Sequence, residues 1–235
     1  MTIQSDVYTI ILETIIIGVL IVLFSKKLDK ADPLAEPKGI IVPIILGLES
    51  VHNMVKSNVG EKRADKLTPY ICVLWVYIFL SNIISLFGLS SPTSNLSVTL
   101  LLSVITWVLI QYVELKYGGI KGYLHSFLEP IAVMLPMNIF GKFSTMVSMS
   151  LRLFGNILCG GIMMQLIYSF SQYLSNTIAG WFGASSVFNF VAPVLTPLLH
   201  AYFDLFSGFI QTLVFVTLTV VLIGNDIPEE IKKES

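Results

Sequence analysis

Charged side chains are scarce in this sequence: Asp, Glu, Lys and Arg make up 12% of its 235 residues, whereas apolar residues make up 54%. The mean hydropathy is +0.81. Soluble domains carry about 25% charged residues, so this composition, with several apolar runs of near-spanning length, predicts a multi-pass membrane protein. The formal net charge of −1 gives no indication of nucleic-acid binding, and we expect no nucleic-acid partner.

Cysteines and sorting signals are also few or missing. Cys72 and Cys159 both lie in apolar stretches, so we expect buried free thiols and no structural disulfide. The N-terminus has no basic region followed by an A-x-A cleavage site, and we expect neither a cleaved signal nor a transit peptide. The bacterial plasma membrane is the simplest location, although an organelle-encoded chain would have a similar composition. No cofactor and no metal site are expected.

The apolar runs predict an all-α integral membrane fold in a single domain, 1–235, with five membrane segments and one interfacial helix. The predicted membrane segments are 7–24, 68–89, 96–113, 130–174 and 187–223. An amphipathic pattern over 39–59, inside a basic linker, predicts the interfacial helix. We expect Pro69 to open the second span, a polar loop over 114–129, a turn over 175–186 and a cytoplasmic tail over 224–235.

The distribution of basic residues predicts the orientation of the chain. Twelve of the fourteen Lys and Arg residues fall in the linker 25–66, the loop 114–129 and the tail 224–235. Basic residues accumulate on the cytoplasmic side of a membrane. With five spans, this places the N-terminus outside the cell and the C-terminus in the cytoplasm.

The last two apolar segments are too long for ordinary spans. As single helices they would measure roughly 68 and 55 Å, against a hydrocarbon core of about 30 Å. Tilts near 20° do not absorb this excess, so we favour a long, steeply tilted hairpin. Breaks within the segments are the alternative, at Pro136, Gly141, Pro193 and Pro197.

Arg152 is the only charged residue between Lys142 and Asp204. A guanidinium at membrane depth costs at least a few kcal/mol and does not deprotonate, so it needs a partner or a water-filled cleft. Helical spacing places small or polar residues on the stripe of Arg152, with Met163 as the exception: Ser148, Gly155, Asn156, Cys159 and Met163. Gly155 and Ser148 would let a partner approach closely, and ordinary helix packing is the alternative.

The run L-R-L-F-G-N at 151–156 resembles the arginine motif of subunit a of F-type ATP synthases. Four further runs resemble the same family in order: S-P-T-S-N-L-S-V-T-L (91–100), G-G-I-K-G-Y-L-H-S-F-L-E-P (118–130), L-P-M-N (135–138) and I-Q-T-L-V-F-V-T-L-T (210–219). The resemblance covers about 39–223. It implies a stator subunit, not catalytic alone, that provides two offset half-channels for ions. The implied partners are the c-subunit ring, the b-subunit peripheral stalk, the remainder of the complex and the lipid bilayer.

The resemblance also implies residue roles. The essential arginine of the family matches Arg152, its polar partner matches Asn156, and its last-helix glutamine matches Gln211. Many members carry an acid five residues after the asparagine and a histidine seven before the glutamine, where this chain has Gly161 and Asp204. In this chain the acid therefore lies on the neighbouring helix, at Asp204, instead of at position 161.

The predicted topology assigns the polar groups to the two sides of Arg152. The expected ion-translocation residues are Arg152, Asp204, Gln211, Asn156, His200, Ser207, Ser148 and Asn138. Asn138 and Ser148 lie inward, whereas Asn156 lies outward. α-Helical spacing puts His200, Asp204, Gly208 and Gln211 on one face, with Ser207 beside it. Asp204 is the expected titratable relay, and the alternative is an acid that only packs against a neighbouring helix. For His200 the alternative is an interfacial histidine near the outer water.

The mechanism expected from these residues is the loading and unloading of protons on ring carboxyls, separated by the fixed charge of Arg152. A sodium-translocating version is an alternative, because the binding site on the ring would decide the ion. A self-contained secondary transporter or channel is the alternative from another class, but the chain shows no internal repeat. A purely structural scaffold is disfavoured by the intramembrane Arg152 and Asp204.

Overall fold

The computed structural model describes residues 5–29, 41–87, 91–128, 132–181, 189 and 191–228. Parts of the predicted linker, of the turn after 181 and of the C-terminal tail lie outside these residues, as do 88–90 and 129–131. The described part is helical, without a strand. Its helices are α1 (Ser5–Asp29), α2 (Ile41–Val59), α3 (Glu61–Ile83), α4 (Leu96–Leu128), α5 (Leu135–Trp181), α6 (Ala192–His200) and α7 (Gly208–Asn225), with the π-helical segment η4 (Ala201–Ser207) and short 3-10 helices η1 (Ile84–Phe87), η2 (Pro92–Ser94) and η3 (Ala132–Met134).

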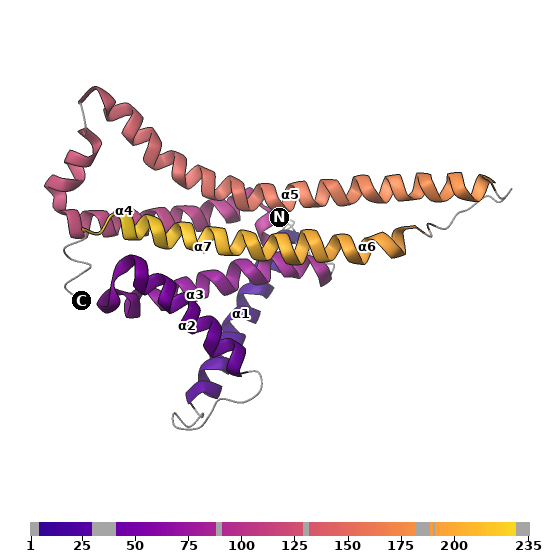
Figure 1. Ribbon diagram of the computed structural model, residues 1–235, viewed down its shortest axis with the longest axis horizontal. Coiled ribbons are helices and arrows are strands. Elements are labelled where there is room, and N and C mark those ends of the chain that lie inside the picture. The colour runs from indigo at the N-terminus through magenta and orange to yellow at the C-terminus, as the bar shows by residue number, and fades with distance from the viewer. Residues whose placement is uncertain are drawn as a thin grey trace.

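Four described helical stretches are long and apolar enough to cross a membrane: Glu61–Leu86, Leu96–Ile120, Leu135–Trp181 and Ala192–Asn225. α1 contains a shorter apolar stretch, Ile10–Leu20. The molecule is thus an all-α integral membrane protein, and the fifth membrane segment stays a prediction. α1 crosses the other long helices at a steep angle (Figure 1).

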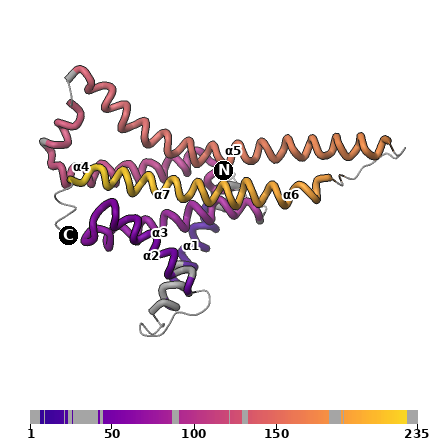
Figure 2. Tube along the Cα trace, viewed as in Figure 1, coloured from indigo at the N-terminus to yellow at the C-terminus, as the bar shows by residue number. Residues whose placement is uncertain are grey.

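The last two apolar segments form one antiparallel hairpin that extends past the ends of α3 and α4 (Figures 1 and 2). α5 has 47 residues, and α6, η4 and α7 form one continuous helix of 34 residues. Pro136 and Pro193 fall in first turns, where a missing N–H is tolerated, and Pro197 does not end α6. At about 70 and 51 Å, both helices exceed the thickness of the hydrocarbon core, which favours a tilted hairpin over broken helices.

Three predicted boundaries are wrong because helices continue through polar residues. α3 begins at Glu61, after a break at Gly60 (φ 90°), so Pro69 lies inside the helix. The predicted loop 114–129 is helical to Leu128, apart from a kink at Gly119 (φ 65°) that only glycine adopts readily. α5 continues to Trp181, and the hydroxyl of its Ser175 donates a hydrogen bond at 2.9 Å to Oδ1 of Asn189, which precedes α6.

α7 is the centre of the core. It packs against α2, α3, α4 and α5, and its Phe215, Val216 and Val220 are almost fully buried. Val55 of α2 and Ile71 of α3 belong to the same cluster. Because these four helices fix α7 from several sides, the polar residues of η4 and α7 have set positions relative to α5.

A close contact joins the ends of α2 and α7, and it predicts the effect of a small substitution. A Cβ added at Gly224 would lie 2.7 Å from the backbone oxygen of Asn58. Gly224→Ala should therefore destabilise the protein by about 1–3 kcal/mol, because a backbone atom has to move. The thermal unfolding midpoint in detergent measures this effect.

Gly47→Ala on α2 is the matched control, because a Cβ there would meet nothing within 4 Å. Equal midpoints for both variants would contradict the close packing of α2 against α7.

Candidate functional site

Arg152 lies on an open face of α5. Its side chain is exposed and makes no hydrogen bond or ion pair with any residue that the structure describes. Met149 and Leu153, which are 3% and 1% exposed, turn the opposite face of the helix into the core. A Cβ added at Gly155 would meet nothing within 4 Å, and Ser148 is exposed. Core packing thus turns Arg152 and its small neighbours away from the rest of this chain.

Both cysteines are free, as expected, but only one is sheltered. Cys72 is half-buried, whereas Cys159 is exposed on the face of Arg152. The expectation of two buried thiols is therefore wrong for Cys159, because no other helix of the described part covers α5 at this position.

The two long helices meet in a regular register. Ser207 donates a hydrogen bond to Oδ1 of Asn156 at 2.6 Å, and the Cβ position of Gly160 lies 3.9 Å from Phe203. The step of four residues from Asn156 to Gly160 along α5 is thus matched by the step of four from Ser207 to Phe203 in the returning helix. Extending this register by one more step of four predicts that Gln211 lies at the level of Arg152.

The amide groups predicted to hold the guanidinium do not bond to it in this chain. Asn156 uses its oxygen to accept the hydrogen bond from Ser207. The Nε2 atom of Gln211 is buried and has no partner among the described residues. A buried amide donor without an acceptor is unfavourable by about 1–3 kcal/mol, so Gln211 has an unused bonding capacity beside the level of Arg152.

A three-residue hydrogen-bonded chain lies beyond this level, toward the tip of the hairpin. Nδ1 of His200 is 2.5 Å from Oδ2 of Asp204, and its Nε2 is 3.0 Å from the hydroxyl of Tyr168 on α5. The side chains of His200 and Asp204 are 34% and 21% exposed. The His200–Asp204 pair follows from helical spacing, but Tyr168 was not predicted. The antiparallel register of the hairpin is the signal that would have found it.

The π-helical turn of η4 changes the face on which the following residues lie. A π turn contains one residue more than a regular turn and occurs frequently at functional sites. Ser207 consequently reaches Asn156 on α5, whereas Gly208 is buried against Asn82 of α3, whose Nδ2 donates to the Gly208 oxygen at 3.1 Å. The expectation that Gly208 shares the face of His200 and Asp204 is therefore wrong.

A second acid is buried where α1 crosses α3. Glu13 is 1% exposed, and its Oε1 accepts a hydrogen bond from Ser81 at 2.5 Å. Its Oε2 is buried without a partner among the described residues. An acid in an apolar helix was visible in the sequence, but its burial depends on the packing of α1 against α3.

Lys142 lies at the opposite end of the bundle, in an ion pair with Glu114 of α4. Its Nζ is 2.5 and 2.7 Å from the two carboxylate oxygens, and the rings of Tyr123 and Phe127 lie 4.6 and 4.1 Å from it. The kink at Gly119 allows the end of α4 to fold back onto this amine. The ion pair therefore fixes the corner between α4 and α5.

Asn138 and Asp226 belong to the same end of the molecule. Nδ2 of Asn138 donates to the backbone oxygen of Phe127 at 2.9 Å, which ties the start of α5 to the end of α4. Burial raises the pKa of Asp226 to about 6, the charge of Glu114 acts in the same direction, and Lys142 opposes both. Three charged groups from α4, α5 and the end of α7 thus influence one another here.

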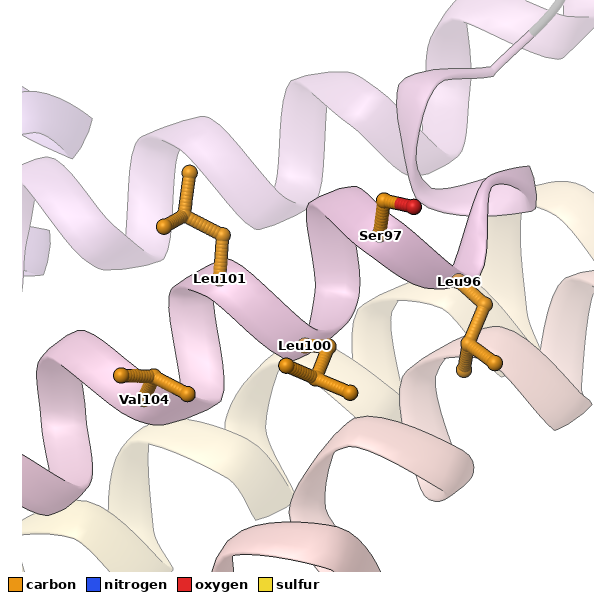
Figure 3. A pocket seen from close by; sticks show the side chains of 5 residues that line it. All are labelled: Leu96, Ser97, Leu100, Leu101 and Val104. Atoms are coloured by element: carbon orange, nitrogen blue, oxygen red, sulfur yellow. The ribbon is translucent and has the colours of Figure 1, made fainter.

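The first turns of α4 form an apolar pocket away from these polar groups (Figure 3). Its lining residues are Leu96, Ser97, Leu100, Leu101 and Val104. They include no titratable side chain, and Ser97 contributes the single polar group. No group of three or more His, Cys, Asp or Glu residues that could hold a metal ion occurs in the part of the chain that the structure describes.

Comparison with known proteins gives consistent matches along most of the chain. Residues 7–224 match the family described as ATP synthase A chain. The chain is 33% identical over 228 residues to ATP synthase subunit a of Mycoplasma pneumoniae, covering 92% of this chain and 76% of the relative. It is 30% identical to ATP synthase subunit a of Bacillus subtilis, covering 78% of this chain and 77% of the relative. It is also 29% identical to the protein of Propionigenium modestum named "ATP synthase subunit a, sodium ion specific". This match covers 76% of this chain and 62% of the relative.

Proposed function

Because this chain belongs to the ATP synthase A chain family, we propose that it provides two offset half-channels that load and unload protons on the carboxyls of a c-subunit ring. As a member of this family, the chain is a membrane subunit of the ATP synthase complex and is not catalytic alone. It is a multi-pass protein of the plasma membrane. The basic residues orient it with the N-terminus outside and the C-terminus in the cytoplasm.

The observation that carries this proposal is the open face of Arg152. A guanidinium without a partner among the described residues, on a helix of membrane-spanning length, requires a partner from elsewhere. A carboxyl on a neighbouring subunit supplies it, and the absence of any obstacle near Gly155 leaves room for a close approach. The b-subunit stalk and the remainder of the complex are the other partners of this subunit.

Arg152 acts through its permanent charge. A ring carboxyl that arrives protonated from one half-channel meets a cation that favours its ionised form, so the proton leaves. The same positive charge repels a proton that would cross directly between the half-channels. Gln211, with its unpartnered amide, can orient the guanidinium without neutralising it.

The outer half-channel contains Asp204 and His200, followed by Ser207 and Asn156 toward Arg152. These side chains form two successive hydrogen-bonded pairs in that direction. The inner half-channel begins at the end where Asn138 lies and passes the exposed Ser148. A proton moving through 100 mV yields about 2.3 kcal/mol, so several protons are needed for each ATP, and a rotating ring collects them.

Asp204→Asn tests the assignment of the outer half-channel. The amide keeps the size of the side chain but does not carry a proton, so passive proton conduction by the membrane sector should fall at least tenfold. Asn138→Ala, which removes a hydrogen bond to the backbone at the corner between α4 and α5, should reduce conduction less. Fluorescent pH measurements on vesicles depleted of the catalytic sector provide the rates.

Equal or reversed effects of the two substitutions would remove Asp204 from the path. Purification addresses the alternative of a self-contained transporter, since only a synthase subunit should co-purify with many copies of a small, carboxyl-bearing helical hairpin. Conduction that requires sodium would favour the ion named for the Propionigenium modestum relative.

A further inference from the structure

We propose that Tyr168 is the outermost member of a proton wire, Tyr168–His200–Asp204, through which protons reach the outer half-channel. This inference rests on the proposed function, because it extends the path that contains His200 and Asp204. The wire spans both arms of the hairpin: Tyr168 comes from α5, and the other two residues come from α6 and η4.

The geometry of His200 gives the wire a direction. An ionised Asp204 accepts a hydrogen bond, so the hydrogen of a neutral imidazole must lie on Nδ1, which is 2.5 Å from Oδ2. Nε2 then has a free lone pair and accepts the hydrogen bond of the Tyr168 hydroxyl at 3.0 Å. Tyr168 and Asp204 are the only titratable groups hydrogen-bonded to this ring among the described residues.

One transfer along the wire balances as follows. A hydronium ion gives a proton to the phenol oxygen while the phenol hydrogen passes to Nε2 and the Nδ1 hydrogen passes to Oδ2. The phenol and the imidazole end neutral, the carboxylate becomes a carboxylic acid, and the hydronium becomes water. His200 is 34% exposed, so exchange with water can return its hydrogen to Nδ1 before the next transfer.

Tyr168 suits the outer end of this wire because it bonds to His200 and is also accessible from outside the protein. Tyr168 is exposed, whereas the side chain of Asp204 is 21% exposed. Both nitrogens of His200 are engaged, so the ring offers no lone pair to a sodium ion. The imidazole is therefore placed to pass a proton between its two partners and not to bind a cation through nitrogen.

Tyr168→Phe in the complete complex tests the proposal, since it removes only the hydroxyl. We expect passive proton conduction to fall about five- to tenfold, the factor that corresponds to one lost hydrogen bond. The ratio of conduction in H₂O to that in D₂O should rise, because proton delivery to His200 becomes the slow step. Tyr173→Phe is the matched control on the same helix, with a side chain that is 70% exposed and a hydroxyl without a partner among the described residues.

Three outcomes would overturn the wire. The first is wild-type conduction in Tyr168→Phe, and the second is slower conduction with an unchanged isotope ratio, which would identify a packing role. The third is conduction that requires sodium. Wild-type conduction in Asp204→Asn would instead contradict the assignment of Asp204 to the outer half-channel. The two variants therefore distinguish failure of the wire from failure of the proposed function. Subunit composition and ATP hydrolysis by the catalytic sector verify that each variant is assembled.

Discussion

Replacing Arg152 with alanine is expected to abolish proton-driven ATP synthesis and to leave the complex largely assembled. The side chain lies on the open face of α5, opposite the buried Met149 and Leu153, so its removal does not disturb the core. The variant loses the fixed charge that favours ionised ring carboxyls and separates the half-channels. Synthesis by the purified complex in proteoliposomes, under an imposed pH difference and membrane potential, should fall to background.

Arg63→Ala is the matched control, because it removes a guanidinium from α3 instead of α5. Arg63 lies over the ring of Tyr117, 5.0 Å from its centroid, near the start of α3 and away from the Arg152 face. We expect this variant to retain most of its synthesis. Normal synthesis in Arg152→Ala would refute the fixed-charge mechanism, and missing subunits in that variant would point to a structural role.

Replacing Lys142 with methionine is expected to destabilise the protein by about 3 kcal/mol. The side chains of Lys142 and Glu114 are 21% and 13% exposed, so the substitution leaves a mostly buried carboxylate without its cation. The α4–α5 corner should loosen, because the ammonium also bonds to Ser126 at 3.2 Å and contacts two aromatic rings. The thermal unfolding midpoint in detergent measures the loss.

The double variant Glu114→Gln with Lys142→Met separates the charge effect from the packing effect. It removes both charges, so much of the lost stability should return. Lys116→Met is a control on α4, the helix of Glu114, where the ammonium lies over the rings of the exposed Tyr112 and the half-buried Tyr117 and should matter little. A double variant as unstable as Lys142→Met would show that the ion pair itself is not what holds the corner.

Helix type and membrane location follow from local composition, which explains why the sequence alone predicted them. A long apolar run must satisfy its backbone groups internally when it lies in lipid, so it forms a helix. The boundaries were harder to predict, because polar residues such as Glu114 and Lys142 stay within helices when they find partners far along the chain. A loop and a helix whose charges are paired elsewhere have similar local sequences.

The sequence by itself determined the family resemblance, the all-α membrane class and the single isolated cation at Arg152, because motifs, apolar run length and charge are properties of the chain. The tertiary structure decided which groups meet. The π-helical turn of η4 directs Ser207 to α5 and Gly208 to α3, and the register of the hairpin brings Tyr168 to His200. Such contacts depend on turn geometry and on the packing of distant helices, neither of which helical spacing along one segment contains.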